Sequence, residues 1–182
     1  MQNLARLDED SANFIRSRRA SIGFLKMGAH VSAIWAPGKR IFLNSIYYSL
    51  NTDPGEPRLH SVLIHEVCHL KQGFFTALSV FGELEAWQLG FRVYQQLTGE
   101  PYHPRLAELM SLPLGWERPV LRRAQHLMQC YAGKNYRADL LPLYPLGREI
   151  KYRLGQRVEE ALSCEKCNFL SLVASDKMNY PN

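Results

Sequence analysis

The most informative part of this chain is a run without proline or glycine, residues 58–72, whose centre reads His65-Glu66-Val67-Cys68-His69. Pro57 precedes the run and Gly73 follows it. Proline is favoured in the first turn of a helix, and glycine is favoured just after its last turn. We therefore predict a helix from roughly residue 58 to residue 72, with this pentapeptide in its second half.

The spacing of the two histidines predicts a metal site. Residues four apart in a helix lie about 6 Å apart along the axis and roughly 40° apart around it. His65 and His69 can therefore bind one Zn²⁺ ion, and Glu66 lies beside the ion. There Glu66 can take a proton from a water whose pKa zinc has lowered to about 7. Two histidines flanking a glutamate on an otherwise apolar helix are costly to bury without a ligand, which favours this interpretation.

A catalytic zinc site needs a third protein ligand, and the next helical stretch offers Glu83 and Glu85. Glu83 lies beside an apolar stripe of helical spacing, whereas Glu85 points to the other side of the helix. If the two helices form an antiparallel hairpin that turns near residues 74–77, Glu83 comes level with residues 67–69. We therefore favour Glu83 as the ligand. The stripe consists of Val80, Leu84, Trp87, Phe91 and Tyr94.

The two motifs resemble those of the zincin metallopeptidases, in particular the gluzincin branch that includes thermolysin. The second motif of that family, Glu-x-x-Ala/Ser-Asp/Asn, is matched here by Glu83 and Ala86. Trp87 replaces the Asp/Asn that supports a zinc-bound imidazole, and Gln72 or Gln88 is available for that role. The resemblance covers residues 40–95. It implies a zincin-like fold, one Zn²⁺ ion, Glu66 as general base and a peptide or protein substrate.

Three strand-like runs precede the motif, at residues 21–27, 30–35 and 40–44. The Pro37-Gly38 turn predicts that the second and third form a β-hairpin. By the resemblance, the edge strand of a small antiparallel sheet binds extended peptide. We place residues 40–44 at that edge, so the candidate substrate-binding residues are Arg40, Phe42 and Asn44. The alternative is that the hairpin only closes the core.

The remaining sequence predicts helices at both ends. Residues 1–19 begin acidic and end basic, which suits a short helix. Residues 118–131 and about 148–163 show helical periodicity, and residues 175–182 are expected to fray. A chain of 182 residues can build one good core. We therefore predict a single α+β domain over residues 1–182: an N-terminal helix and a small antiparallel sheet, then the active-site helix, the glutamate helix and a helical C-terminal half.

Two further groups of residues stay open. Metallopeptidases of this kind place a histidine or tyrosine beside the oxyanion, and nothing in the sequence selects among His126, Tyr131, Tyr136 and Tyr144. Cys164 and Cys167 form one C-x-x-C pair without a second pair of suitable spacing. Reduced thiols are the default interpretation of that pair, and a structural metal or redox pair is the alternative. We interpret Cys68 as a small buried residue and leave Cys130 without a role.

Composition restricts the partners. No run is long and apolar enough for a membrane span or a signal peptide, so we expect a cytoplasmic protein without a membrane partner. The net charge of +5 is spread over short basic groups, which indicates solvated helix faces and makes a nucleic-acid partner unlikely. The leading hypothesis is a zinc-dependent peptidase. The alternatives are a regulatory or interaction protein that retains the zinc site and acts on one protein partner, and a basic nucleic-acid-binding domain.

Overall fold

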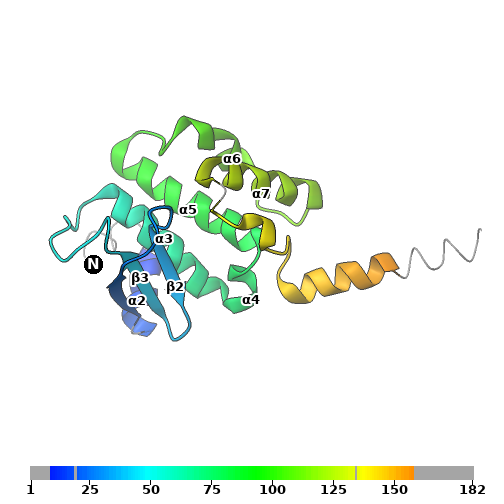
Figure 1. Cartoon of the computed structure of the whole chain (residues 1–182), viewed down its shortest axis with the longest axis horizontal. Coiled ribbons are helices and arrows are strands. Elements are labelled where there is room, and N and C mark those ends of the chain that lie inside the picture. The colour runs from blue at the N-terminus through cyan, green and yellow to red at the C-terminus, as the bar shows by residue number, and fades with distance from the viewer. Residues whose placement is uncertain (1–8, 19, 134, 158–182) are drawn as a thin grey trace, which may run out of the picture. The chain divides into compact units, whose positions relative to one another are not determined.

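The computed structural model describes residues 9–18, 20–133 and 135–157 (Figure 1). Its contacts divide the chain into two units, Met1–Leu146 and Gly147–Asn182. The first unit combines helices with one small sheet, which agrees with the α+β prediction. In the second unit, residues 147–157 are helical. The predicted helix end at residue 163, the tail 175–182 and the pair Cys164 and Cys167 lie outside the described residues. The expectation of one domain over residues 1–182 stays a prediction.

The chain begins with α2 (Glu9–Arg18), followed by a three-stranded sheet of β1 (Ser21–Leu25), β2 (Ala33–Ala36) and β3 (Arg40–Asn44). The predicted hairpin is confirmed, because β2 pairs antiparallel with β3. Gly38 and Lys39 both take positive φ angles in its turn, 81° and 61°. Two expectations are wrong. The sheet order is β1-β3-β2, so residues 40–44 form the central strand and not the edge. In addition β1 runs parallel to β3, so the sheet is mixed and not antiparallel.

Asn44 explains this topology. The connection from β1 to β2 crosses the end of β3, where the Asn44 side chain is completely buried. Its amide nitrogen donates to the carbonyls of Gly28 and Val31 at 3.0 and 2.7 Å. Its side-chain oxygen accepts from the backbone N–H groups of Met27 and Ile46, each at 3.1 Å. One buried amide thus satisfies the crossing loop and places β1 and β2 on opposite sides of β3.

The predicted helix at residues 58–72 is confirmed as α3 (Pro57–Gln72). Pro57 occupies its first turn, the side chain of Glu56 accepts from the Arg58 N–H, and Gly73 ends the helix with a φ of 78°. The short helix α4 (Phe74–Ala77) forms the predicted turn, and α5 (Val80–Thr98) follows. Ser79 caps α5 through the Gly82 N–H at 3.1 Å. Both caps place the helix starts where the sequence signals them.

The pair α3 and α5 forms the centre of the first unit. The two helices run antiparallel, since Gly90 late in α5 faces Ser61 early in α3. A Cβ atom at Gly90 would lie 2.8 Å from the Ser61 carbonyl oxygen, so this close approach requires glycine. A buried cluster joins α2, β3, α3 and α5 through Ile15, Ile41, Ile64, Val67 and Val93.

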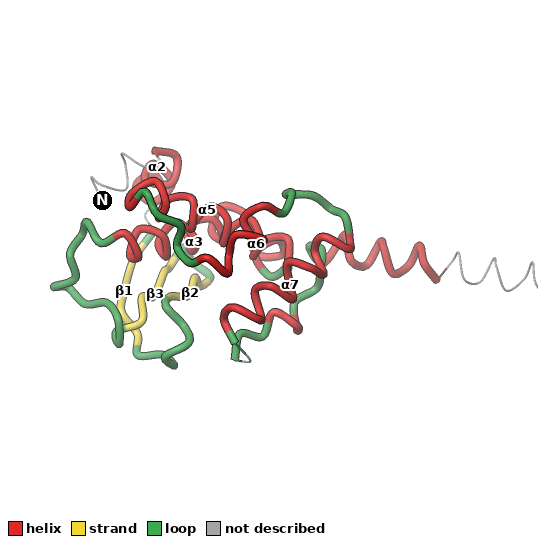
Figure 2. Tube along the Cα trace, turned by 90° about the horizontal axis from the view of Figure 1, so that it is seen from above, coloured by secondary structure: helices red, strands yellow, loops and turns green. Residues whose placement is uncertain are grey.

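The C-terminal part of this unit packs on the other side of α5. It comprises η1 (Pro104–Leu106), α6 (Ala107–Ser111), α7 (Arg118–Ala132) and η2 (Ala138–Leu140), and α7 confirms the helix predicted at residues 118–131. In both views the sheet and α2 lie to one side of α3 and α5, and α6 and α7 lie to the other (Figures 1 and 2). None of the described helices combines the length and the apolar composition that a bilayer crossing requires.

Candidate metal centre

Two residues of α3 and one of α5 meet where the helices face each other. The Nε2 atoms of His65 and His69 lie 3.0 Å apart. The Glu83 carboxylate lies 3.7 Å from Nε2 of His65 and 3.5 Å from Nε2 of His69. Within the described residues, these three side chains form the group that could hold a metal ion. The structure therefore brings together the three residues that sequence spacing selected as ligands.

The hydrogen bonds on the far side of each ring determine which nitrogen carries the proton. Nδ1 of His69 lies 3.1 Å from Oε1 of Gln72. The Gln72 amide nitrogen donates to the Gly82 carbonyl and to Oε2 of Glu85, each at 2.9 Å, so its oxygen faces His69 as an acceptor. Nδ1 of His69 is therefore a donor, which in the neutral ring leaves the lone pair on Nε2.

The hydrogen bond on the far side of the His65 ring likewise indicates which nitrogen carries the proton. Its ring is hydrogen-bonded to the Ala86 backbone, an interaction that favours the charged ring, as expected for a carbonyl acceptor. Burial and the neighbouring His69 outweigh it and lower the pKa of His65 well below its usual 6.5. The His65 ring is therefore neutral and also directs a lone pair from Nε2 toward the centre.

A cation resolves this arrangement. Two lone pairs at 3.0 Å beside a carboxylate repel one another unless a positive charge lies among them. Zinc bonds of about 2.0–2.1 Å at tetrahedral angles separate ligand atoms by about 3.3 Å. The three separations here, 3.0, 3.5 and 3.7 Å, bracket that value. Two imidazoles and one carboxylate are also a ligand set that catalytic zinc uses, so the residues fit the ion.

Glu85 and Gln72 support the site without belonging to it. Glu85 accepts from Gln72, and Gln72 orients His69. Of the two glutamines left open by the sequence, Gln72 lies at the imidazole, whereas Gln88 donates to the carbonyls of Leu109 and Leu112 at 2.9 and 2.8 Å. An amide and a carboxylate in series thus contact an imidazole of the kind that, in the zincin pattern, is supported by the Asp/Asn that Trp87 replaces here.

Glu66 lies one position after His65 on α3, with only 6% of its surface exposed. Burial, together with the Glu83 charge, raises the pKa of Glu66 to about 8. A hydrogen bond from the Trp35 backbone acts in the opposite direction. The Trp35 ring also lies 6.0 Å from the His69 ring. Strand β2 therefore lies against the candidate metal centre and contacts the carboxyl group of Glu66 beside it.

Tyr136 is a site residue that sequence reasoning could not select. Its hydroxyl donates to Oε2 of Glu83 at 2.5 Å and accepts from the Trp87 indole at 2.9 Å. Burial, reinforced by Glu83, raises the pKa of Tyr136 well above 10, so the group remains a neutral donor. No local pattern announces a contact across 53 positions of sequence.

The other three candidates for an oxyanion donor make different contacts. His126 lies on α7, with Nε2 3.4 Å from the sulfur of Cys130. The Tyr131 ring packs on Trp87 at 5.7 Å between ring centroids. Tyr144 is buried, 6.4 Å from Trp116 between centroids. Tyr136 is therefore the member of the set that touches a predicted ligand.

The proposed substrate-binding residues lose their rationale with the correction of the sheet order. Arg40, Phe42 and Asn44 belong to the central strand, and the Asn44 side chain holds the crossing loop. Arg40 is exposed, and its side chain donates to the Pro37 carbonyl at 3.2 Å. A central strand pairs on both sides and has no free edge for an added strand. The edge strand that lies against α3 is β2.

The backbone of β2 has a defined free side. The Asn44 N–H bonds to the Ser32 carbonyl at 2.9 Å, and bonded pairs alternate along an antiparallel ladder. Ala33 and Trp35 therefore direct their backbone N–H and C=O groups away from β3. The hydrogen bond from the Trp35 backbone to Glu66 agrees with this register.

No family model matches this chain, and neither the curated proteins nor the solved structures include a match to it.

Proposed function

We propose that the protein is a zinc-dependent peptidase that hydrolyses peptide bonds, with His65, His69 and Glu83 as ligands and Glu66 as general base. One observation carries the proposal. Two imidazole lone pairs and a carboxylate converge within 3.7 Å, and the next residue on the helix supplies a buried carboxyl group. A cation site beside a shielded base of raised pKa is the arrangement that activates a water for hydrolysis.

When bound, zinc supplies Lewis acidity that polarises the scissile carbonyl and lowers the pKa of water at the site to about 7. Glu66 takes the proton from that water and later passes it to the leaving amine. The Trp35 N–H holds the Glu66 carboxylate in place during both transfers. A general base must accept and release a proton, which a pKa nearer neutrality favours.

Tyr136 supplies a candidate donor for the developing oxyanion. Its phenol remains protonated, and the Trp87 indole fixes the position of its oxygen. Its present acceptor is Glu83 at 2.5 Å, so the hydroxyl lies within reach of the metal centre. A pre-oriented donor aimed at developing negative charge is typically the largest electrostatic contribution to catalysis.

The edge of β2 supplies the surface for the substrate. An extended peptide can pair with the outward-facing backbone groups of Ala33 and with the Trp35 carbonyl, while the Trp35 N–H stays on Glu66. Since Trp35 also contacts Glu66 and His69, a peptide bound there lies beside the metal centre. The substrate class that fits this edge is an extended segment of peptide or unfolded protein.

The test begins with elemental analysis of protein purified without added metal, where we expect one zinc per chain. The protein is then incubated with a pool of proteome-derived peptides, and new termini are identified by mass spectrometry. Glu66→Gln should retain the zinc and lose roughly 10²–10⁴-fold in turnover, because the general base is gone. A fully active Glu66→Gln variant would refute the mechanism. A zinc-loaded wild type that leaves the whole pool intact would refute peptidase activity.

A further inference from the structure

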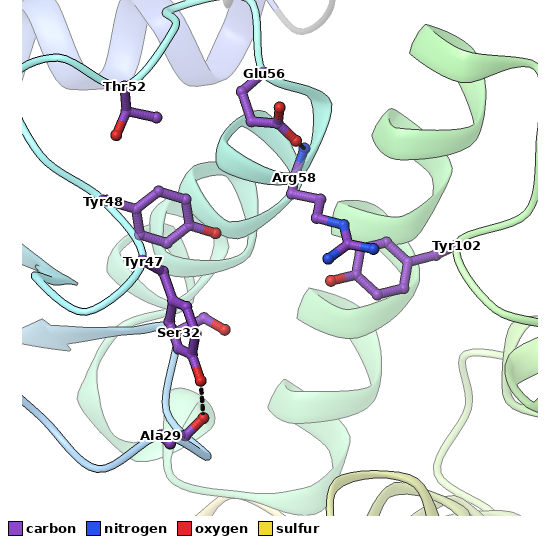
Figure 3. Close-up of a pocket in the computed structure, with 8 residues that line it drawn as sticks. All are labelled: Ala29, Ser32, Tyr47, Tyr48, Thr52, Glu56, Arg58 and Tyr102. Carbon is purple, nitrogen blue, oxygen red and sulfur yellow. Dashed lines mark hydrogen bonds between the residues drawn. The ribbon is translucent and has the colours of Figure 1, made fainter.

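A cavity of about 460 Å³ opens beside the first turn of α3, away from the metal ligands. Its walls come from three segments (Figure 3). Ser32 lies just before β2, Tyr48 follows β3, and Arg58 and Tyr102 face each other from the start of α3 and the segment after α5. The cavity therefore lies where the edge strand and the helix that bear the site both begin.

Helix geometry relates this cavity to the metal centre. Arg58 precedes His65 by seven residues, which is two turns, or about 10.5 Å along the axis and 20° around it. The two side chains therefore lie on the same face of α3. Strand β2 runs the same way, from Ser32 at the cavity to Trp35 at the ring of His69. The cavity and the candidate metal centre thus lie about 10.5 Å apart along α3, beside the two ends of β2.

The cavity is lined by one cationic side chain, Arg58, by one carboxylate, Glu56, and by several hydroxyl groups. The Arg58 guanidinium lies over the Tyr102 ring, 5.9 Å from its centroid. Within the described ranges, no carboxylate forms an ion pair with it. Glu56, the acidic residue of the cavity, instead accepts from the Arg58 backbone N–H at 3.2 Å. An arginine fork beside hydroxyl donors is the standard recognition element for a carboxylate.

The tyrosines differ in what their hydroxyls can do. Tyr47 donates its hydroxyl to the Ala29 carbonyl, so that group is engaged (Figure 3). The hydroxyls of Tyr48 and Tyr102 point into the cavity, on either side of the space in front of Arg58 (Figure 3). Burial raises the pKa of Tyr48 to about 12 and also raises that of Tyr102. Both phenols therefore remain protonated and can donate to an anion.

We propose that this cavity binds a carboxylate of the substrate, two or three residues after the scissile bond, through Arg58 with Tyr48 and Tyr102. The inference depends on the proposed peptidase function. A peptide antiparallel to β2 runs from Trp35 toward Ser32, so the residues after the scissile bond approach Arg58. At about 3.3 Å per extended residue, the 10.5 Å step corresponds to three residues. The carboxylate is either the C-terminus of a short peptide or an Asp or Glu side chain within a longer one.

The first experiment uses a peptide that the wild type cleaves, shortened so that it ends one to five residues after the cleavage site. Each length is made as free acid and as amide, and a second amidated series carries Glu at the second or third position. We expect kcat/KM to peak when the carboxylate is two or three residues from the cleaved bond, about tenfold above the neutral peptide, the lower range for a charged hydrogen bond. A peak in the free-acid series identifies the terminal carboxylate, and a peak in the Glu series identifies the side chain.

Matched variants assign the effect to the cavity. Arg58→Gln should erase the difference between acid and neutral peptides. Arg122→Gln removes an exposed arginine of α7 that does not line the cavity, and it should preserve that difference. Equal cleavage of acidic and neutral peptides by the wild type would overturn the carboxylate site and leave the peptidase function standing.

A second experiment does not depend on turnover. In ¹⁵N-labelled protein as purified, the Nε–H signal of Arg58 is assigned by its loss in Arg58→Gln. Acetyl-trialanine as the free acid should shift this signal, and acetyl-trialanine amide should leave it in place. If both peptides or neither move the signal, the carboxylate site is refuted. If the acid alone moves it while no peptide in the pool is cleaved, the site stands and the peptidase function fails.

Discussion

The pH dependence of stability tests the buried position of Glu66 without any substrate. In the zinc-free protein, burial and the Glu83 charge raise the pKa of Glu66 from 4.5 to about 8. The folded state therefore holds a proton that the unfolded chain has released. The contribution of Glu66 to stability is therefore largest near and below pH 4.5 and falls as the pH rises through about 8. A shift of this size corresponds to a loss of about 5 kcal/mol, at 1.36 kcal/mol per pKa unit.

Urea unfolding at pH 5, 6, 7 and 8 in the presence of a chelator measures this loss. Glu66→Gln keeps the size of the side chain and an acceptor for the Trp35 N–H, and it removes the charge. The variant should become more stable than the wild type by roughly 1.2 kcal/mol for each pH unit between 5 and 8, or about 3.5 kcal/mol over this range. The difference between the two proteins cancels the contributions of groups that both share, including His65.

A control variant and the addition of zinc test whether the pH dependence comes from Glu66. Glu100→Gln removes an exposed carboxylate and should follow the wild-type curve. Added zinc should flatten the wild-type curve, because a cation beside Glu66 favours its ionised form. Parallel curves for wild type and Glu66→Gln in chelator would refute the shielded carboxyl group on which the mechanism depends.

Three further outcomes are expected. In a zinc titration, Glu83→Gln should weaken zinc binding far more than Glu85→Gln. The second variant should lose about 10- to 100-fold in zinc affinity, because only the Gln72 side chain that orients His69 is released. The reverse order would identify Glu85 as the ligand. Tyr136→Phe should lower kcat roughly 10²-fold with little change in KM if the phenol stabilises the oxyanion, and a change confined to KM would contradict that role. Peptide mapping after brief iodoacetamide treatment at pH 8 should find Cys130 modified and Cys68 unmodified. Burial raises the pKa of Cys68 to about 12, whereas Cys130 is exposed, so equal labelling would contradict the packing of α3.

The clustering of His65, His69 and Glu83 could be predicted because each feature that brings them together is local. The 58–72 helix has a proline at its start and a glycine at its end, and its histidine spacing is a property of one helix. Glu83 follows from helical phase and from one short turn, which α4 supplies. Glu83 follows His69 by only 14 positions. The short connection leaves the two helices few ways to pack, so the height of Glu83 beside α3 could be estimated.

The supporting contacts could not be predicted, because each depends on packing between distant segments. Tyr136 reaches Glu83 across 53 positions, and the Trp35 N–H reaches Glu66 from another element. Gln72 was one of two equivalent candidates until the packing of α3 on α5 placed Glu85 beside it. From the sequence one can list residues able to hydrogen-bond the predicted ligands or Glu66. Only the packing of distant segments determines which of them do so.

The identity of the edge strand, β2 and not residues 40–44 as expected, matters for the proposed mechanism. Either strand of a hairpin can be an edge until the partner of the third strand is known. Here β1 pairs with β3, and Asn44 holds the loop that crosses the end of β3. The exposed edge is therefore β2, and its Trp35 N–H already binds Glu66. A peptide that pairs with β2 next to Trp35 would adjust the strand that orients the general base. If a peptide binds this edge as proposed, its binding is coupled to the alignment of Glu66 through one backbone, which residues 40–44 at the edge would not have provided.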